Sequence, residues 1–108
     1  MIRMVFYDIT GTKGRTKISN YLEAQGLERI QFSVFVGEIE PPRWQKVWKK
    51  LVELYEKECD AATDRIFSHV VDRDNFGKML TLGLSPDKAW IMGEVSSLYF
   101  GSKEEDGK

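Results

Sequence analysis

Cysteine and histidine are almost absent from this chain of 108 residues, which contains one of each, Cys59 and His69. A single cysteine cannot form a disulfide within the chain, and the Cys/His spacing of a zinc site is missing. The sequence also lacks a Walker-type glycine loop, a dinucleotide-binding fingerprint and a nucleophile elbow. These absences leave carboxylates and basic side chains as the main candidates for chemistry.

The sequence also lacks a signal-peptide pattern and any apolar run long enough to cross a bilayer, so we expect a cytoplasmic protein without membrane association. The content of 42% hydrophobic and 31% charged residues is typical of an ordinary globular protein. The length predicts one domain, over residues 1–100, followed by a disordered tail at 101–108. A chain of this size buries only about two-thirds of its unfolded surface, so oligomerisation would help it.

An overall excess of basic residues, which is typical of nucleic-acid-binding proteins, is missing too, because the net charge is −1. The charge is unevenly divided, however. Residues 1–50 hold nine Lys and Arg against five Asp and Glu, whereas residues 51–108 hold seven against twelve. The first half could carry a basic binding surface, or the segregation could be that of an ordinary solvated surface.

Hydrophobic periodicity predicts two helices among several strands. The strands are expected at residues 1–9, 29–36, 65–71 and 79–82, with one more supplied by 89–92 and 95–100. The first helix is expected from Arg15 to a glycine stop at Gly26, and the second opens at Pro41 and Pro42. Turns are expected at residues 72–77 and 84–88.

This order of elements predicts the fold class. A strand, helix, strand, helix, strand order with further C-terminal strands places both helices on one face of a sheet. With right-handed crossovers, it predicts an α+β fold, the ferredoxin-like split βαβ sandwich with one or more extra C-terminal strands. The first strand is apolar on both faces, so we expect a second copy of the chain to cover the free face and form a homodimer.

Asp8 ends the apolar first strand, where an unpaired charge would be costly to bury. Its carboxylate could cap the following turn, as aspartate often does at a strand end. It could equally be a ligand for a hard cation such as Mg²⁺. One carboxylate makes a poor metal site, but a twofold dimer that brought two copies of Asp8 together would repair this.

Basic residues surround the expected position of Asp8: Lys13, Arg15, Lys17 and Arg29. Each could be ordinary solvated surface. As a set they could neutralise nucleic-acid phosphates, if the loop after the first strand folds back. Phe35 lies on the less apolar face of its strand, where it could contact the core of a partner or offer a stacking surface.

Two separated motifs stand out: Val5-Phe6-Tyr7-Asp8-Ile9, and Arg29-Ile30-Gln31-Phe32-Ser33-Val34-Phe35-Val36-Gly37. They resemble the pattern of the Cas-two (Cas2) family of CRISPR-associated proteins. That pattern is a hydrophobic strand ending in Tyr-Asp-Ile, followed about two dozen residues later by Arg-Val-Gln-Tyr-Ser-Val-Phe-x-Gly. The resemblance covers about residues 2–57 and is specific, because both motifs agree in content and spacing.

The resemblance implies a ferredoxin-like homodimer joined through its sheets, often with a C-terminal strand exchanged between subunits. Members are described as metal-dependent endonucleases acting on single-stranded RNA or double-stranded DNA. They also bridge dimers of the Cas-one integrase when spacers are captured. By resemblance, Asp8 would bind the metal together with Asp8 of the partner subunit, and its functional neighbours would be Tyr7, Arg15, Arg29 and Phe35. Lys17 lies where the family often has arginine.

The resulting hypothesis is a slow phosphodiester endonuclease. One Mg²⁺ or Mn²⁺ between two Asp8 carboxylates would activate the substrate, since no general base is obvious. The main alternative is a scaffold whose basic residues, Lys13, Arg15, Lys17 and Arg29, hold the double-stranded DNA of a spacer precursor without cleaving it. A toxin-type ribonuclease of the VapD group and a small-ligand regulatory domain are further alternatives.

Overall fold

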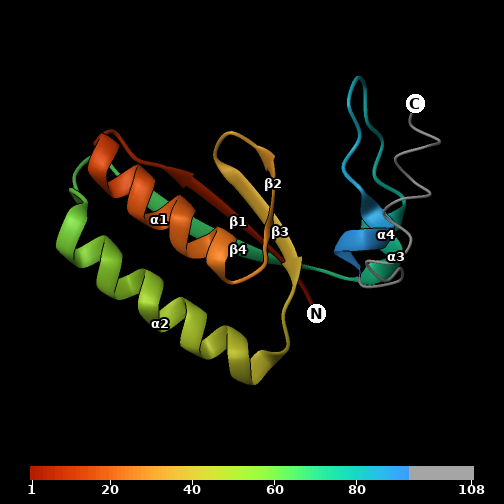
Figure 1. Cartoon of the computed structure of the whole chain (residues 1–108), viewed down its shortest axis with the longest axis horizontal. Helices are drawn as coiled ribbons and strands as arrows, with labels where there is room; N and C mark the ends of the chain where they lie inside the picture. Colours follow the sequence, from red (N-terminus) through yellow and green to blue (C-terminus); the bar gives the residue numbers. More distant parts are fainter. Residues whose placement is uncertain (93–108) are drawn as a thin grey trace.

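Four strands and two long helices make up most of the computed structural model, which describes residues 1–92 (Figure 1). The elements are β1 (Ile2–Asp8), α1 (Thr12–Ala24), β2 (Glu28–Gln31), β3 (Val34–Glu38), α2 (Pro41–Glu58), β4 (Arg65–Val71), and two short helices, α3 (Arg73–Gly77) and α4 (Lys88–Ile91). The strands form one antiparallel sheet in the order β2-β3-β1-β4. This order, with α1 and α2 on one face, confirms the predicted ferredoxin-like α+β sandwich.

β1 lies at the centre of the sheet, and its side chains alternate between two apolar layers. Val5 and Tyr7 face the helices and pack against the buried stripes of α1 and α2. These stripes have helical spacing, with Ile18 and Leu22 in α1 and with Val47 and Leu51 in α2. Burying a large apolar side chain contributes about 1.5–3 kcal/mol, so this layer holds both helices on the sheet.

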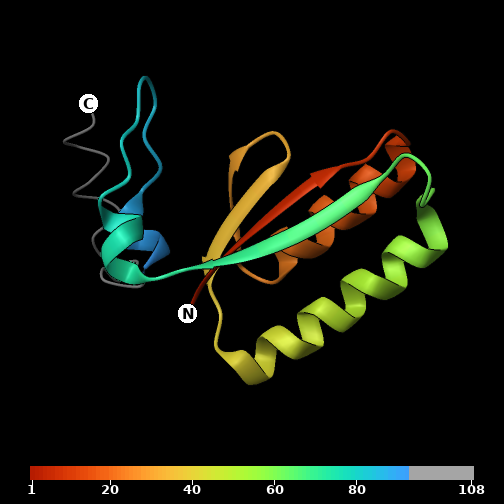
Figure 2. The same ribbon diagram turned by 180° about the vertical axis from the view of Figure 1, so that it is seen from behind.

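The opposite face of the sheet is covered at one end only. There, side chains from β1, β3, α3 and the end of α4 form a second apolar cluster: Ile2, Val36, Phe76, Ile91 and Met92. Towards the other end of β1, Phe6 stacks on Phe67 with ring centroids 5.4 Å apart, and Phe67 is 52% exposed. Figure 2 shows this face, which neither α1 nor α2 covers. An apolar surface is therefore left bare beside Asp8.

The ends of the long helices follow simple backbone rules. α2 opens on Pro41 and Pro42, whose missing amide hydrogens would have had no partner in a first helical turn. Gly26, with a φ of 90°, turns the chain away after α1. α1 begins earlier than predicted and includes Gly14, where a Cβ would lie 3.1 Å from the Glu58 carbonyl oxygen. This glycine lets α1 approach the end of α2 closely.

The prediction of a single strand at residues 29–36 is wrong. The chain forms two strands there, β2 and β3, joined by a turn at Phe32 and Ser33. Val36 nevertheless belongs to the second apolar cluster, and Ile30 packs against that cluster, so both lie on one face as predicted. The prediction failed because a tight hairpin also places alternate residues on one face, so its pattern matches that of one longer strand.

Residues 72–77, predicted as a turn, contain the short helix α3. The Asp72 carboxylate accepts a hydrogen bond from the Asn75 amide at 2.7 Å and caps the first helical turn. Aspartate and asparagine favour both turns and helix starts, so composition alone did not distinguish them. The helix places Phe76 in the second apolar cluster.

The prediction of two further C-terminal strands, at residues 79–82 and 89–92, is also wrong for the residues that the structure describes. Residues 79–82 are irregular, and residues 89–92 lie in or just after α4. Leu80 and Leu82 are 96% and 101% exposed, and the segment pairs with none of the four strands of the sheet. Alternating leucines suggested a strand, but a strand forms only where a neighbour accepts its hydrogen bonds.

The remainder of the predicted C-terminal part, the strand at 95–100 and the tail at 101–108, lies outside the described residues. Within the described part, no helix combines the length and the apolar character needed to span a membrane.

Candidate functional site

Asp8 ends β1 with its exposed side chain on the sheet face that the long helices leave free. Its neighbour across the β1–β4 ladder is Arg65. Among residues 1–92, no side chain or amide forms a hydrogen bond or ion pair with the Asp8 carboxylate. The turn-capping role is therefore not used, and the carboxylate is available to a cation.

Arg15 holds the loop that follows Asp8. Its guanidinium donates to the carbonyl oxygens of Ile9 at 3.1 Å and Thr10 at 2.8 Å. It also donates to the Thr12 hydroxyl at 3.1 Å. Arg15 therefore uses three of its five N–H donors to fix backbone next to the candidate site.

Asp64 holds the same loop from the other side. Its carboxylate accepts hydrogen bonds from the amide and the hydroxyl of Thr10, both at 3.0 Å, and from the Asp60 amide at 2.8 Å. The amides of Asp60 and Thr10 lower the pKa of Asp64 to about 2. Asp64 was not predicted from the sequence, although an aspartate just before a strand was an available signal.

Tyr7 and Phe35, both implied by the resemblance, are buried on the helix side of the sheet. Phe35 is 0% exposed and stacks on Tyr7 with ring centroids 6.2 Å apart. The Tyr7 hydroxyl donates to the Phe32 carbonyl oxygen at 3.3 Å, and burial raises the pKa of Tyr7 above its ordinary value. Tyr7 is therefore protonated at neutral pH, and Phe35 offers no exposed ring for a nucleobase.

Arg29 shares a polar pocket with Tyr7 and Arg15, and we call it the Arg15–Arg29 pocket. It has a volume of about 290 Å³, and its other lining residues are Thr12, Thr16, Ser19 and Phe32. The Arg29 guanidinium lies over the rings of Phe35 and Phe32, 5.0 and 5.6 Å from their centroids. Tyr7 and Asp8 are consecutive in a strand, so their side chains point to opposite faces. The pocket and Asp8 therefore lie on opposite faces of the sheet.

Lys13 and Lys17 do not line this pocket. The Lys17 Nζ lies 2.9 Å from one Glu58 carboxylate oxygen, and the Lys13 Nζ lies 3.9 Å from the other. The hydrogen bond and charge of Lys17, with the charge of Lys13, lower the pKa of Glu58. Helical residues four apart share a side of the helix, whereas residues two apart do not, so α1 separates these lysines from Arg15. Glu58 was not predicted from the sequence, because its place in the last turn of α2 carried no distinctive signal.

Metal-ligating side chains are sparse in the described part of the chain. Within residues 1–92, no three or more His, Cys, Asp or Glu side chains form a group that could hold a metal ion. Asp8 fits a hard cation as one ligand, because its carboxylate is exposed and unpartnered among these residues. The resemblance implies a site of two such carboxylates, of which one chain would provide one.

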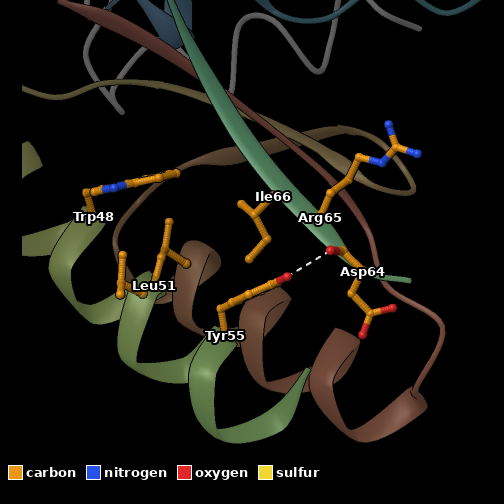
Figure 3. A pocket seen from close by; sticks show the side chains of 7 residues that line it. Trp48, Leu51, Tyr55, Asp64, Arg65 and Ile66 are labelled. Atoms are coloured by element: carbon orange, nitrogen blue, oxygen red, sulfur yellow. Dashed lines mark hydrogen bonds between the residues drawn. The ribbon is translucent and has the colours of Figure 1, made fainter. Parts of the chain in front are cut away.

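A second pocket, of about 310 Å³, lies between α2 and the outer edge of β4 (Figure 3). Trp48 and Tyr55 of α2 line it together with Ile66 of β4. The Tyr55 hydroxyl donates to the Asp64 carbonyl oxygen at 2.9 Å. The charged residues that line this pocket are Asp64, whose carboxylate is already hydrogen-bonded, and Arg65. This pocket offers packing surface rather than catalytic groups.

Comparison with known sequences finds relatives over most of the chain. Residues 1–79 match the family described as CRISPR associated protein Cas2. A CRISPR-associated endoribonuclease Cas2 of Pyrobaculum aerophilum is 40% identical over 86 residues, which cover 80% of this chain and 90% of that protein. Another CRISPR-associated endoribonuclease Cas2, from Archaeoglobus fulgidus, is 42% identical over 41 residues, 38% of this chain and 44% of that protein.

Solved structures share the fold. The crystal structure of a hypothetical protein from Thermus thermophilus gives a TM-score of 0.64 at 27% identity, and the match covers 79% of this chain and 93% of that one. Streptococcus pyogenes Cas2 gives a TM-score of 0.62 at 23% identity, covering 77% of this chain and 100% of that one. The family match over residues 1–79 and the similarity to nearly the whole Pyrobaculum protein agree with each other. The chain belongs to the Cas2 family of CRISPR-associated proteins.

Proposed function

We propose that this protein is a metal-dependent phosphodiester endonuclease that acts as a homodimer, with one active site built from the Asp8 carboxylates of two copies. The state of Asp8 carries the proposal: it is exposed, ends a central strand and has no partner within residues 1–92. Such a carboxylate is available to a hard cation. The Pyrobaculum aerophilum relative is named an endoribonuclease, which supports cleavage of nucleic acid as the reaction.

In addition to the state of Asp8, two features support the proposal that a second copy of the chain completes the site. The described residues of one chain form no cluster of acidic groups that could hold a metal ion. Phe6 and Phe67 leave an apolar surface on the same sheet face as Asp8. A twofold dimer that buries this surface near its axis brings equivalent residues of the two copies close together. Burial of the surface and completion of the site would then be one event.

Mg²⁺ or Mn²⁺ is the cation that carboxylate ligands favour, and Asp8 of each copy would hold it. When bound, the cation would supply Lewis-acid polarisation of the phosphodiester and activation of water. Arg15 binds the carbonyl oxygens of Ile9 and Thr10 and so fixes the backbone after Asp8. A ligand fixed in this way loses less freedom when it binds the cation.

Tyr7 and Phe35 have positioning roles in this proposal. The raised pKa of Tyr7 and its position on the helix face make it a poor proton acceptor for a reaction at Asp8. The two stacked rings instead hold β1 against the β2–β3 hairpin. Catalysis would therefore depend on Asp8 and the cation, with no side-chain base, which is consistent with a slow enzyme.

Single-stranded RNA is the substrate we propose first, because the name of the Pyrobaculum relative specifies RNA. Double-stranded DNA is the other class that the resemblance implies. Bridging of the Cas-one integrase stays a prediction, since no feature of residues 1–92 tests it. A scaffold role would gain support if spacer acquisition survived the loss of Asp8 and failed when Arg15, Lys17 and Arg29 were neutralised.

Asp8→Asn tests the nuclease proposal. The substitution keeps the side-chain size and removes the ligand charge, so we expect Mg²⁺-dependent cleavage of RNA and DNA to fall about a hundredfold or more. Metal binding, measured by calorimetry, should be lost as well. The melting temperature should stay within about 2 °C of wild type, because the side chain makes no hydrogen bond or ion pair in the described chain.

Glu56→Gln is the matched control, because it removes one exposed carboxylate from α2 with the same change in charge. It should cleave like the wild type. Wild-type cleavage by Asp8→Asn would overturn the assignment. Equal losses in both variants would attribute the effect to net charge rather than to a site.

A further inference from the structure

The Arg15–Arg29 pocket contains two positive charges that its surroundings barely neutralise. The acidic group nearest to Arg29 is Glu23, whose carboxylate oxygen is 4.0 Å from the Arg29 Nε, beyond hydrogen-bonding distance. Arg15 forms its hydrogen bonds with carbonyl oxygens and a hydroxyl, and forms no ion pair with any residue in the described part. A pocket with this balance attracts an anion.

The Arg29 guanidinium is held by aromatic rings rather than by hydrogen bonds. Its central carbon lies 5.0 Å from the Phe35 ring centroid and 5.6 Å from that of Phe32. Within residues 1–92, none of its N–H groups donates a hydrogen bond. Cation–π contacts of this kind hold a guanidinium without using its N–H donors, and these donors are the groups with which arginine binds phosphate through two hydrogen bonds.

Arg15 contributes from the other wall of the pocket. Two bonds from Nη1 and one from Nη2 fix its position, which leaves Nε–H and one Nη2–H. The positions of Arg15 and Arg29 are thus both set before a ligand arrives. Such preorganisation strengthens binding, because little side-chain freedom remains to be lost.

Hydroxyl groups complete the lining. Thr12, Thr16 and Ser19 lie along one side of α1, at positions i, i+4 and i+7. The Ser19 hydroxyl donates to the Thr16 carbonyl oxygen at 3.2 Å. The Thr16 hydroxyl has no hydrogen bond in the described chain and can donate to a ligand. Arginine donors with neutral hydroxyls are a common set of phosphate contacts in nucleic-acid-binding proteins.

We infer that the Arg15–Arg29 pocket binds one phosphate group of the nucleic acid, and that Thr16 is one of its ligands. The inference rests on the proposed function for the source of that phosphate. Because the pocket lies on the helix side of the sheet, the phosphate it holds is distinct from the phosphodiester cleaved at Asp8. The pocket would anchor the strand, and Asp8 would act on a different linkage.

The test measures binding without metal, so that it does not depend on cleavage. A fluorescent oligonucleotide is titrated in EDTA with wild type, Thr16→Val and Arg29→Gln. We expect affinity to fall about threefold for Thr16→Val and about tenfold for Arg29→Gln, in line with losing a neutral and a charge-assisted hydrogen bond. The slope of log affinity against log salt should become shallower by about one for Arg29→Gln only.

Thr81→Val is the control for Thr16→Val, because Thr81 is exposed, lies in the segment between α3 and α4 and does not line the pocket. Matched oligonucleotides with a 5′-phosphate and a 5′-hydroxyl identify the source of the bound group. If the variants lose affinity for both oligonucleotides, the pocket binds a backbone phosphate. If they lose affinity only for the oligonucleotide with a 5′-phosphate, it binds a terminal phosphate. Either result supports the pocket. Unchanged affinity of both variants for both oligonucleotides would overturn it.

Inorganic phosphate gives a second readout that needs no nucleic acid. In ¹H–¹⁵N spectra of the wild type, added sodium phosphate should shift the Arg29 Nε–H and the Thr16 amide, and Thr16→Val should weaken that response. Absence of any shift would contradict the pocket. A protein that binds phosphate here but shows no metal-dependent cleavage would overturn the proposed nuclease while supporting this inference.

Discussion

Asp64 links the two loops that flank the end of β1. Its carboxylate accepts hydrogen bonds from the Asp60 amide at 2.8 Å and from the Thr10 amide at 3.0 Å. These donors favour the ionised form and lower the pKa of Asp64 to about 2 in the folded protein. An aspartate in the unfolded chain has a pKa of about 3.9. The loop next to Asp8 is therefore best held when Asp64 is ionised.

Protonation of Asp64 should destabilise the fold. A lowered folded-state pKa contributes stability above the unfolded pKa, and that contribution is lost as the pH falls from about 4 towards about 2. We expect Asp64→Asn to lower the melting temperature by several degrees at pH 7 and to flatten its dependence on pH in that window. Thermal unfolding followed by circular dichroism measures both effects.

Asp74→Asn is the control for this prediction, since it removes an exposed carboxylate from α3. It should leave the pH dependence in the acid window unchanged. If Asp64→Asn kept the full wild-type dependence, the hydrogen bonds to Asp64 would not be the source of the acid sensitivity.

Single residues could be predicted from the sequence where the signal was local. Asp8 stood out because an acidic residue interrupts an apolar run. Alternation also placed Phe35 correctly on the face opposite to Val36. That this is the face covered by the helices follows only from the complete fold. The sequence therefore left open whether Phe35 was core or a stacking surface, and it is core.

At the scale of elements, α1 decides which basic residues can act together. Arg15 turns towards the β1–α1 loop, whereas Lys13 and Lys17 approach Glu58 at the end of α2. The sequence suggested one basic set, because the spacing alone did not show where α2 would end. Packing of α1 against α2, allowed by Gly14, determines the division.

Glu58 should compete with nucleic acid for Lys13 and Lys17. Its carboxylate holds Lys17 at 2.9 Å, so a phosphate must displace it to use that lysine. We expect Glu58→Gln to raise affinity for an oligonucleotide about two- to fivefold at low salt, the scale of an ion pair at the protein surface whose lysine is partly exposed. The salt dependence of binding should become steeper. Titrations in EDTA at several salt concentrations measure both changes.

Glu56→Gln provides the comparison for Glu58→Gln, because it makes the same change in charge on the same helix away from the two lysines. Its effect on affinity should be smaller. Equal effects of the two variants would mean that net charge, and not release of Lys13 and Lys17, controls binding.

At the scale of the whole molecule, the ferredoxin-like arrangement could be predicted because the order of helix and strand patterns is local information. The hairpin at β2–β3 could not, since its alternation matches that of one longer strand. The short helices α3 and α4 could not either, since their composition did not distinguish a helix from a turn or a strand. Among the described residues, the exposed apolar side chains include Phe67 on the sheet and Leu80, Leu82 and Leu84 beyond α3. Exposed apolar surface of this kind favours association.

The shared Asp8 site is tested most directly by mixing wild-type and Asp8→Asn chains in varying proportions, with subunits exchanged to completion, and measuring Mg²⁺-dependent cleavage. If one site needs Asp8 from both copies, only dimers of two wild-type chains are active. Activity should then follow the square of the wild-type fraction, about one quarter of full activity in an equal mixture. A linear decline, with about one half remaining, would mean that each chain carries its own site and would contradict the shared carboxylate pair.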